Sequence, residues 1–138
     1  MTQPILSVRG LSVSYGKVEA VRSVALDLPR GTIVTVIGAN GAGKSTLLNA
    51  LMGLLPASGS VLLEGREQIG RPIAARVADG LSLVPERREL FSSMPVEDNL
   101  MLGGYKLASK SELRDELDRI YVRFPRLKER RAQLAGTL

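Results

Sequence analysis

A glycine-rich stretch of eight residues, G-A-N-G-A-G-K-S at positions 38–45, most constrains what this chain can fold into. It fits the pattern G-x-x-x-x-G-K-[ST], in which glycines without a Cβ let backbone N–H groups turn inward around phosphate oxygens. In that pattern the ammonium group of Lys44 reaches the β and γ phosphates, and the hydroxyl of Ser45 can bind Mg²⁺. The stretch therefore predicts a site for nucleotide phosphates.

The residues on either side of this stretch have the order that such a loop requires. Residues 32–37, T-I-V-T-V-I, are all β-branched and of strand length, which is typical of a buried parallel strand. From Thr46 onward, leucines recur at helical spacing until Gly53 and Pro56 signal an end. The positive end of that helix would face the same anion. This order favours phosphate binding over a chance glycine-rich turn.

The chain before residue 93 is otherwise rich in predicted strands. Alternating apolar residues predict strands over residues 5–15, 21–28 and 60–64, and a fourth over residues 81–84. A short helix is expected over residues 72–77. Strands on both sides of a nucleotide loop indicate an α/β fold with an antiparallel contribution.

Beyond residue 93 the pattern is helical. Pro95 suits a first helical turn, and Ser109 with Glu112 is a candidate capping box. We expect Asp115 and Arg119 to pair on the solvent side of the second helix, which Pro125 ends. Its apolar stripe is Leu113, Leu117, Ile120, Tyr121 and Phe124.

Composition excludes several classes of function. The 138 residues include no cysteine, which excludes disulfides and thiolate chemistry. We expect neither a secretory signal nor a membrane span, because no apolar run is long enough. Most of the net charge of +5 lies in residues 106–131. One interpretation of this charge is a patch that binds nucleic acid. Only two aromatic residues, Tyr121 and Phe124, lie among the basic residues, so a solvated helical surface is favoured. No nucleic-acid partner is expected.

Three segments together resemble the ATP-binding subunit of an ABC transporter. They are L-S-V-S-Y-G at residues 11–16, the loop G-A-N-G-A-G-K-S-T, and V-P-E-R-R-E-L-F-S-S-M-P-V-E-D-N-L at residues 84–100. The resemblance runs along the whole chain. Within that family the chain looks most like the branched-chain amino-acid importers of the LivF type, with urea importers and other amino-acid importers as alternatives.

The resemblance implies a partial ABC ATP-binding domain with a phosphate-loop NTPase core. Residues 1–30 and 58–66 would form its antiparallel β part, residues 31–57 and 67–93 the nucleotide-binding core, and residues 94–138 the start of a helical subdomain, with the C-terminal part missing. It also implies membrane permease subunits and a second ATP-binding subunit as partners. The protein would then lie on the cytoplasmic face of the inner (plasma) membrane.

The resemblance also implies roles for individual residues. Tyr15 would stack on the adenine of ATP, and Ser45 and Glu86 would bind Mg²⁺. Most of the family has glutamine at the position of Glu86; glutamate offers a charged oxygen to the cation but no donor. Arg87, Arg88 and Phe91 would lie near the surface that docks the membrane subunit. The ATP phosphates would be held by Gly38, Asn40, Gly41, Gly43, Lys44, Ser45 and Thr46.

Other parts that the family uses for catalysis are not found in these residues. The chain reads A-G-T-L at residues 135–138, where the family continues into its L-S-G-G signature, and it contains no histidine. We therefore expect ATP binding without substantial hydrolysis by this polypeptide alone. A non-hydrolysing regulatory module and an independent phosphate-loop enzyme, such as a small kinase with Glu86 on Mg²⁺, are the alternatives. Because parallel strands need neighbours, we also expect exposed strand edges and apolar patches.

Overall fold

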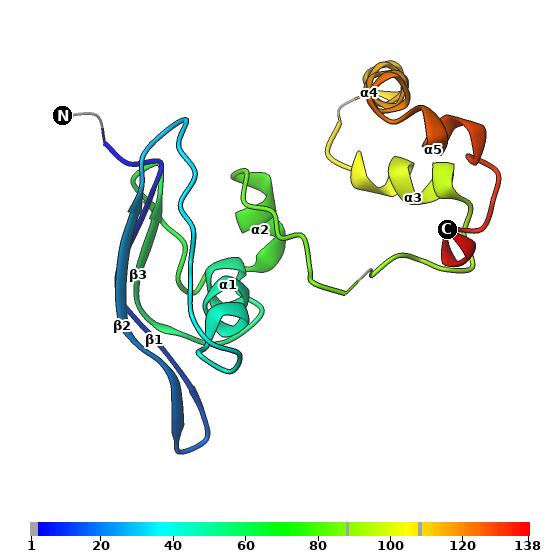
Figure 1. Cartoon of the computed structure of the whole chain (residues 1–138). Coiled ribbons are helices and arrows are strands. Elements are labelled where there is room, and N and C mark those ends of the chain that lie inside the picture. Colours follow the sequence, from blue (N-terminus) through cyan, green and yellow to red (C-terminus); the bar gives the residue numbers. More distant parts are fainter. Residues whose placement is uncertain (1–2, 88, 108) are drawn as a thin grey trace. The chain divides into compact units, whose positions relative to one another are not determined.

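A computed structural model of the protein describes residues 3–87, 89–107 and 109–138. Arg88, one of the predicted docking residues, lies outside the described residues. The chain divides into two compact units, Met1–Val84 and Pro85–Leu138. In Figure 1 the first unit runs from blue to green and the second from green to red. The finer division of the sequence into three parts stays a prediction.

The first unit is built on an antiparallel sheet with the strand order β2-β1-β3-β4. The three longer strands confirm those predicted over residues 5–15, 21–28 and 60–64. A register shift between Val8 and Leu11, with Gly10 at φ 61°, inserts an extra residue into β1. Because of this bulge, Val8 and Leu11 are both fully buried. The strands are β1 (Leu6–Tyr15), β2 (Val18–Leu28), β3 (Ser58–Leu63) and β4 (Arg66–Glu67).

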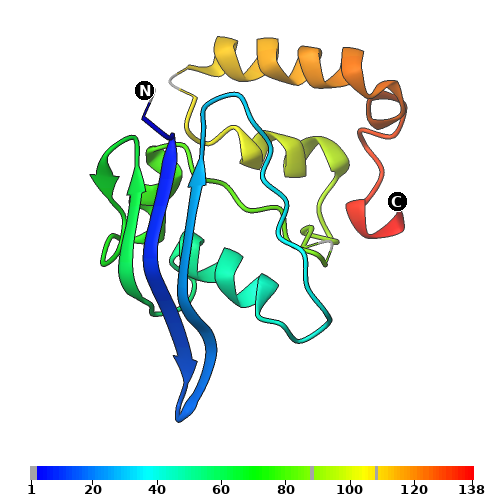
Figure 2. The same ribbon diagram turned by 60° about the vertical axis from the view of Figure 1, so that its left-hand side comes forward.

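The helix that follows the phosphate loop, α1 (Lys44–Met52), covers one face of this sheet. Figures 1 and 2 both show α1 lying on the concave side of the long strands. Gly53 follows the helix in the left-handed conformation at φ 84°, so the predicted end is confirmed. Side chains of the sheet and of α1 form one buried cluster: Leu6, Val8, Leu11, Val13, Val21, Leu47, Ala50, Leu51, Val61 and Leu63.

A second helix of this unit, α2 (Ile73–Ala78), confirms the short helix predicted over residues 72–77. Asp79 ends it and accepts hydrogen bonds from Arg66 at 2.8 Å, from Arg71, and from the amide of Gln68 at 3.2 Å. These bonds tie the end of α2 to β4 and the turn after it. The hydrogen bond from Gln68, followed by the two arginine charges, lowers the pKa of Asp79 despite its desolvation.

The strands predicted over residues 32–37 and 81–84 are wrong. Neither segment forms a ladder with any described residue. Ile33, Ile37 and Val84 are 94%, 90% and 91% exposed. A parallel strand is stabilised by neighbours on its edges and by cover on both faces, and neither segment has them here. The expectation of exposed apolar patches is confirmed.

The second unit is helical, as predicted for the chain beyond residue 93. A capping box starts its longest helix: Ser109 Oγ accepts from the backbone N–H of Glu112 at 3.1 Å, and a Glu112 carboxylate oxygen accepts from the N–H of Ser109 at 3.2 Å. That helix ends at Arg123, just before Pro125, again as predicted. Pro95 precedes the first helix and gives it no side-chain cap. The elements are α3 (Val96–Gly103), α4 (Lys110–Arg123), α5 (Pro125–Glu129) and the 3₁₀ turn η1 (Ala135–Thr137).

The predicted ion pair between Asp115 and Arg119 is wrong. The guanidinium of Arg119 instead donates to the carboxylate of Glu116 at 3.0 Å. Neighbours three and four positions apart are equally within reach on a helix, so the spacing alone could not choose between the two acids.

One buried tyrosine joins two helices of this unit. The hydroxyl of Tyr121 on α4 donates to a carboxylate oxygen of Glu97 on α3 at 2.7 Å. Burial, with the hydrogen bond to Glu97, raises the pKa of Tyr121 to about 12. Phe124, the last member of the predicted apolar stripe, is instead 52% exposed.

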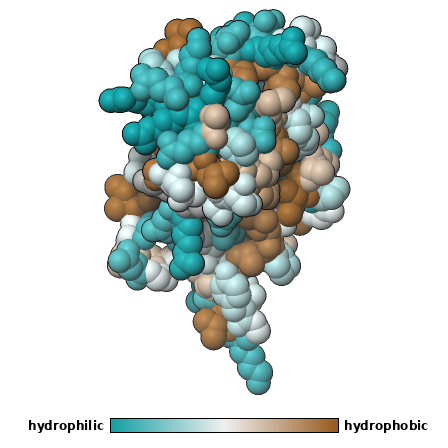
Figure 3. Space-filling model, turned by 90° about the vertical axis from the view of Figure 1, so that its right-hand side faces the viewer, coloured by the Kyte–Doolittle hydropathy of each residue, from teal (hydrophilic) through white to brown (hydrophobic). Residues whose placement is uncertain are grey.

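Apolar side chains also reach the surface. Figure 3 shows brown, hydrophobic side chains interrupting the hydrophilic surface on the face that it presents. In the second unit, Phe91, Tyr105 and Val122 are each more than half exposed. Within the described part of the chain, no helix is long and apolar enough to cross a membrane.

Candidate functional site

The phosphate loop has the backbone conformation that the motif requires at two of its glycines. Gly41 and Gly43 both adopt the left-handed conformation at φ 85°, which glycine reaches without the Cβ penalty of other residues. Gly41 lies in open space, but a Cβ on Gly43 would come 2.5 Å from the carbonyl oxygen of Ala20 on β2. Gly43 is therefore needed for close packing of the loop against the sheet, which the motif alone did not predict.

The side chain of Lys44 folds back over the loop that precedes it. Its Nζ donates to the carbonyl oxygens of Gly38 and Ala39, both at 2.7 Å. The N–H of Ala42 closes a turn to Ala39 at 3.1 Å. The ammonium group is thus held against the backbone of the loop, where a phosphate bound by that backbone would meet it.

The first turn of α1 leaves its N–H groups available to an anion. Gly43 is the cap residue, no side chain of the described residues caps this end, and the first turn contains no acidic residue. The first N–H groups of any helix have no partner inside the helix, and the helix dipole makes this end positive. Ser45 and Thr46 lie in this turn, Ser45 with its side chain exposed.

Tyr15, the residue predicted to stack on adenine, lies beside this turn. It ends β1, is 51% exposed, and its hydroxyl lies 3.4 Å from Oγ1 of Thr46. A cavity of about 350 Å³ lies next to the loop, between β2, residues 34–37 and the start of α1. The fold therefore brings Tyr15, Lys44 and Thr46 to one site, although 31 positions separate Tyr15 from Thr46.

The predicted Mg²⁺ residues lie in different units. Ser45 belongs to the phosphate loop, whereas Glu86 is an exposed residue near the start of the second unit. Among the described residues, no group of three or more acidic side chains could by itself hold a metal ion. Mg²⁺ in nucleotide sites commonly keeps waters and substrate phosphates as ligands, so one hydroxyl from the protein fits this chemistry. Asn40 lies exposed at the turn of the loop.

Sequence reasoning missed a residue at the other end of α1. Arg76 on α2 is only 4% exposed, and its Nη1 donates to the carbonyl oxygens of Ala50 at 3.1 Å and Leu51 at 2.8 Å. The sequence around Arg76 does not predict this contact, because the carbonyl groups that it binds lie about 25 positions earlier in the chain.

The fold is that of the ABC transporter family, whose domain matches residues 21–137. The chain belongs to that family. It is 44% identical over 135 residues to the high-affinity branched-chain amino acid transport ATP-binding protein BraG of Pseudomonas aeruginosa, a match that covers 97% of this chain and 58% of BraG. It is 34% identical over 129 residues to the probable branched-chain amino acid transport ATP-binding protein LivF of Archaeoglobus fulgidus, covering 93% of this chain and 54% of LivF. The chain thus spans little more than half the length of these relatives.

Solved structures agree on the fold. An ATP-binding cassette of an ABC transporter superposes with a TM-score of 0.83 and 26% identity, over 99% of this chain and 60% of the other. A nucleotide-free ATP-binding cassette gives a TM-score of 0.81 at 22% identity, over 99% and 59% of the two chains, and shows the fold alone. The α/β fold predicted from the sequence, that of part of an ABC ATP-binding domain, is confirmed.

Proposed function

We propose that this chain binds ATP as part of a subunit that energises import of branched-chain amino acids. The observation that carries the proposal is the geometry of residues 38–46. Two left-handed glycines, a lysine folded over the loop and an uncapped helix start all lie within these nine residues. Membership of the ABC transporter family and the names of BraG and LivF support both the nucleotide and the substrate class.

Each residue at the cradle would have a distinct task in binding. The N–H groups of the loop and of the first turn of α1 donate to phosphate oxygens, and Lys44 exchanges its two carbonyl partners for a phosphate. The hydroxyl of Ser45 binds Mg²⁺, which neutralises part of the phosphate charge. The ring of Tyr15, half-exposed at the end of β1, offers its face to the adenine.

Calorimetry with Mg²⁺ and ATP tests the binding proposal on the purified chain. Lys44→Ala should weaken binding about ten- to a hundredfold, because it removes a charged hydrogen-bond donor. Lys128→Ala is the matched control, since Lys128 is an exposed lysine of the second unit. Unchanged ATP affinity in Lys44→Ala would contradict the proposal. A different result would support the independent phosphate-loop enzyme: the chain alone hydrolyses ATP, and Glu86→Gln abolishes this hydrolysis.

Uptake assays in the organism that carries the gene test which substrate is transported. Deletion of the gene should lower uptake of radiolabelled leucine, isoleucine and valine and leave urea uptake unchanged. A loss confined to urea would favour the urea importers. A Lys44→Ala copy should fail to restore amino-acid uptake, and such a dependence on bound nucleotide would place the protein on the cytoplasmic face of the membrane.

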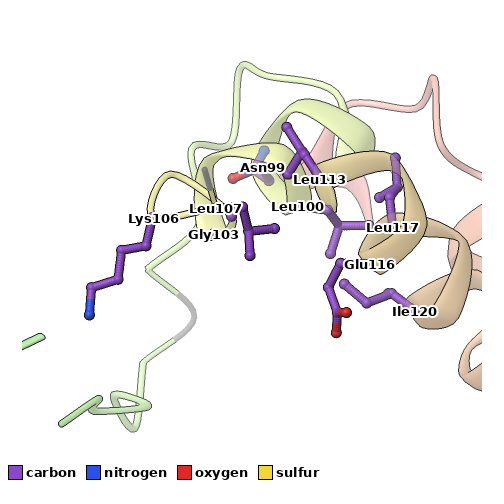
Figure 4. A pocket seen from close by; sticks show the side chains of 10 residues that line it. Asn99, Leu100, Gly103, Lys106, Leu107, Leu113, Glu116, Leu117 and Ile120 are labelled. Atoms are coloured by element: carbon purple, nitrogen blue, oxygen red, sulfur yellow. The ribbon is translucent and has the colours of Figure 1, made fainter. Parts of the chain in front are cut away.

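We also propose that the second unit docks a helix of a permease subunit. A pocket of about 460 Å³ lies between α3 and α4. Figure 4 shows Leu100, Leu113, Leu117 and Ile120 around it, with the charged end of Lys106 extending away from these side chains. An apolar groove with charges at its edge suits an amphipathic helix, and membership of the ABC transporter family supports a permease subunit as the source of that helix.

Co-purification with the permease subunits tests this docking. Leu117→Asp places a charge in the groove and should abolish co-purification while leaving ATP binding unchanged. Val122→Asp is the matched control, because Val122 is 84% exposed on the same helix and does not line the pocket. Equal loss in both variants, or in neither, would rule out the groove as the docking site.

A further inference from the structure

The guanidinium of Arg76 is a buried cation bound to the end of another helix. Nη1 donates to two carbonyl groups in the last turn of α1, those of Ala50 and Leu51, and Nε donates to the carbonyl of Arg71 at 3.2 Å. Carbonyls in the last turn of a helix lack N–H partners further along the helix. The carbonyl of Ala50 also accepts from the backbone N–H of Gly53 at 3.0 Å. Arg76 therefore adds a second donor to Ala50 and supplies a donor to Leu51. Figure 1 shows α2 beside α1 in the first unit.

The charge of Arg76 is directed at α1 rather than at an acid. Among the described residues, no carboxylate lies within ion-pair distance of it. Burial lowers the pKa of Arg76, with a smaller opposite effect from Glu67, but an arginine remains protonated. A positive charge at the C-terminal end of a helix offsets the negative end of the helix dipole. The opposite end of the same dipole faces the phosphate loop.

Gly53 makes room for this contact. A Cβ on Gly53 would come 2.8 Å from both Cζ and Nε of Arg76. Any other residue would therefore push the guanidinium away from the helix end, besides straining the left-handed backbone at φ 84°. The sequence predicts Gly53 only as the stop of the helix.

α1 is thus held at both ends within the first unit. Gly43 packs against the carbonyl of Ala20 at the phosphate-loop end, and Gly53 receives Arg76 at the other. A helix fixed in this way presents its first N–H groups and Lys44 in one position, and such preorganisation lowers the cost of binding.

We propose that Arg76 is a positioning residue for nucleotide phosphates, acting through α1 without touching the ligand. The inference rests on the proposed function, since it presupposes that the loop binds ATP. Its consequence is specific to the anionic part of the nucleotide. Loss of Arg76 weakens the binding of ligands that carry a β phosphate and leaves the binding of an uncharged nucleoside unchanged.

Calorimetry on folded Arg76→Met with adenosine, ADP and ATP tests this consequence. We expect binding of ADP and ATP to weaken about three- to tenfold, because the first turn of α1 is then held less firmly before binding, and binding of adenosine to stay as in the parent protein. Arg66→Met is the matched control: it removes the same charge from an exposed arginine that contacts Asp79 and not α1. It should bind all three ligands normally.

Arg76→Lys and Gly53→Ala extend the test in case Arg76→Met does not fold. Arg76→Lys keeps the charge but loses the guanidinium fork, and should show a smaller loss for ATP than Gly53→Ala, which displaces the whole group. Parent-like ATP affinity in both folded variants overturns the inference, as does an equal loss for adenosine and ATP in any Arg76 variant. If the parent protein binds no ATP, or if Lys44→Ala binds it normally, the proposed function fails instead.

Discussion

Residues 6–15 and 32–37 are both predicted strands from their apolar residues, but only the first segment forms a strand. The first segment is β1, paired on one side with β2 and on the other with β3. It contributes Val8 and Leu11, both fully buried, to the core. The second segment forms no ladder with any residue that the structure describes, and Ile33 and Ile37 are at least 90% exposed. The difference shows that strand propensity is realised only where the chain supplies partners on the edges and cover on a face.

The two segments differ in the distance along the chain to their partners. β2 follows β1 after a two-residue turn, so an antiparallel ladder forms at short range. Residues 32–37 enter the phosphate loop, and a parallel neighbour would have to come from after a crossover. Residues 81–84 are the predicted strand that could serve as this neighbour, but they too pair with no strand among the described residues. Pairs of similar residues, one packed against the rest of the protein and one exposed, therefore test how much packing contributes to stability.

The largest expected difference is between Leu11→Ala and Ile33→Ala. Leu11 is fully buried, so its truncation should lower the free energy of unfolding by about 2–5 kcal/mol. Ile33 is 94% exposed, so its truncation should change that free energy by less than about 0.5 kcal/mol. Urea unfolding followed by circular dichroism measures both. Equal destabilisation would show that residues 32–37 are a packed strand in solution.

A second comparison sets Gly43 against Gly41 in the phosphate loop. Both have φ 85°, so alanine at either position should cost about 1–2 kcal/mol of folding free energy for the left-handed backbone. Only at Gly43 would the new Cβ also meet a backbone atom, the carbonyl oxygen of Ala20. We expect Gly43→Ala to cost about 1–3 kcal/mol more than Gly41→Ala, measured by the same urea unfolding. Indistinguishable variants would mean that the loop is not packed against β2.

The parts that could be predicted from the sequence depend on near neighbours. The capping box of Ser109 and Glu112 and the end of α1 at Gly53 each involve residues within a few positions, so the local pattern is sufficient. The contact of Arg76 with α1 and the exposure of residues 32–37 depend on distant parts of the chain. The sequence indicated Gly43 as a loop glycine and Gly53 as the helix end, but it did not predict the close approach of Ala20 to Gly43 or of Arg76 to Gly53.

The smallest expected difference is between two tyrosines of the second unit. Tyr121 is buried and donates to Glu97, whereas Tyr105 is 66% exposed. Tyr121→Phe should lower the free energy of unfolding at pH 7 by about 1 kcal/mol, the net value of one hydrogen bond, and Tyr105→Phe should leave it unchanged.

The pH dependence of that cost follows from the pKa of Tyr121, which is raised to about 12 from the ordinary value of 10.0. The folded protein keeps this proton up to about pH 12, whereas the unfolded chain loses it near pH 10. The stabilisation is therefore fully present below pH 10 and is lost as the pH rises from 10 to 12. Urea unfolding across this range should show the stability advantage of the parent protein over Tyr121→Phe shrinking as the pH rises, because the parent alone loses this contribution. A cost that stays constant from pH 9 to pH 12 would mean that Tyr121 titrates like an exposed tyrosine, and that α3 and α4 are not joined through it.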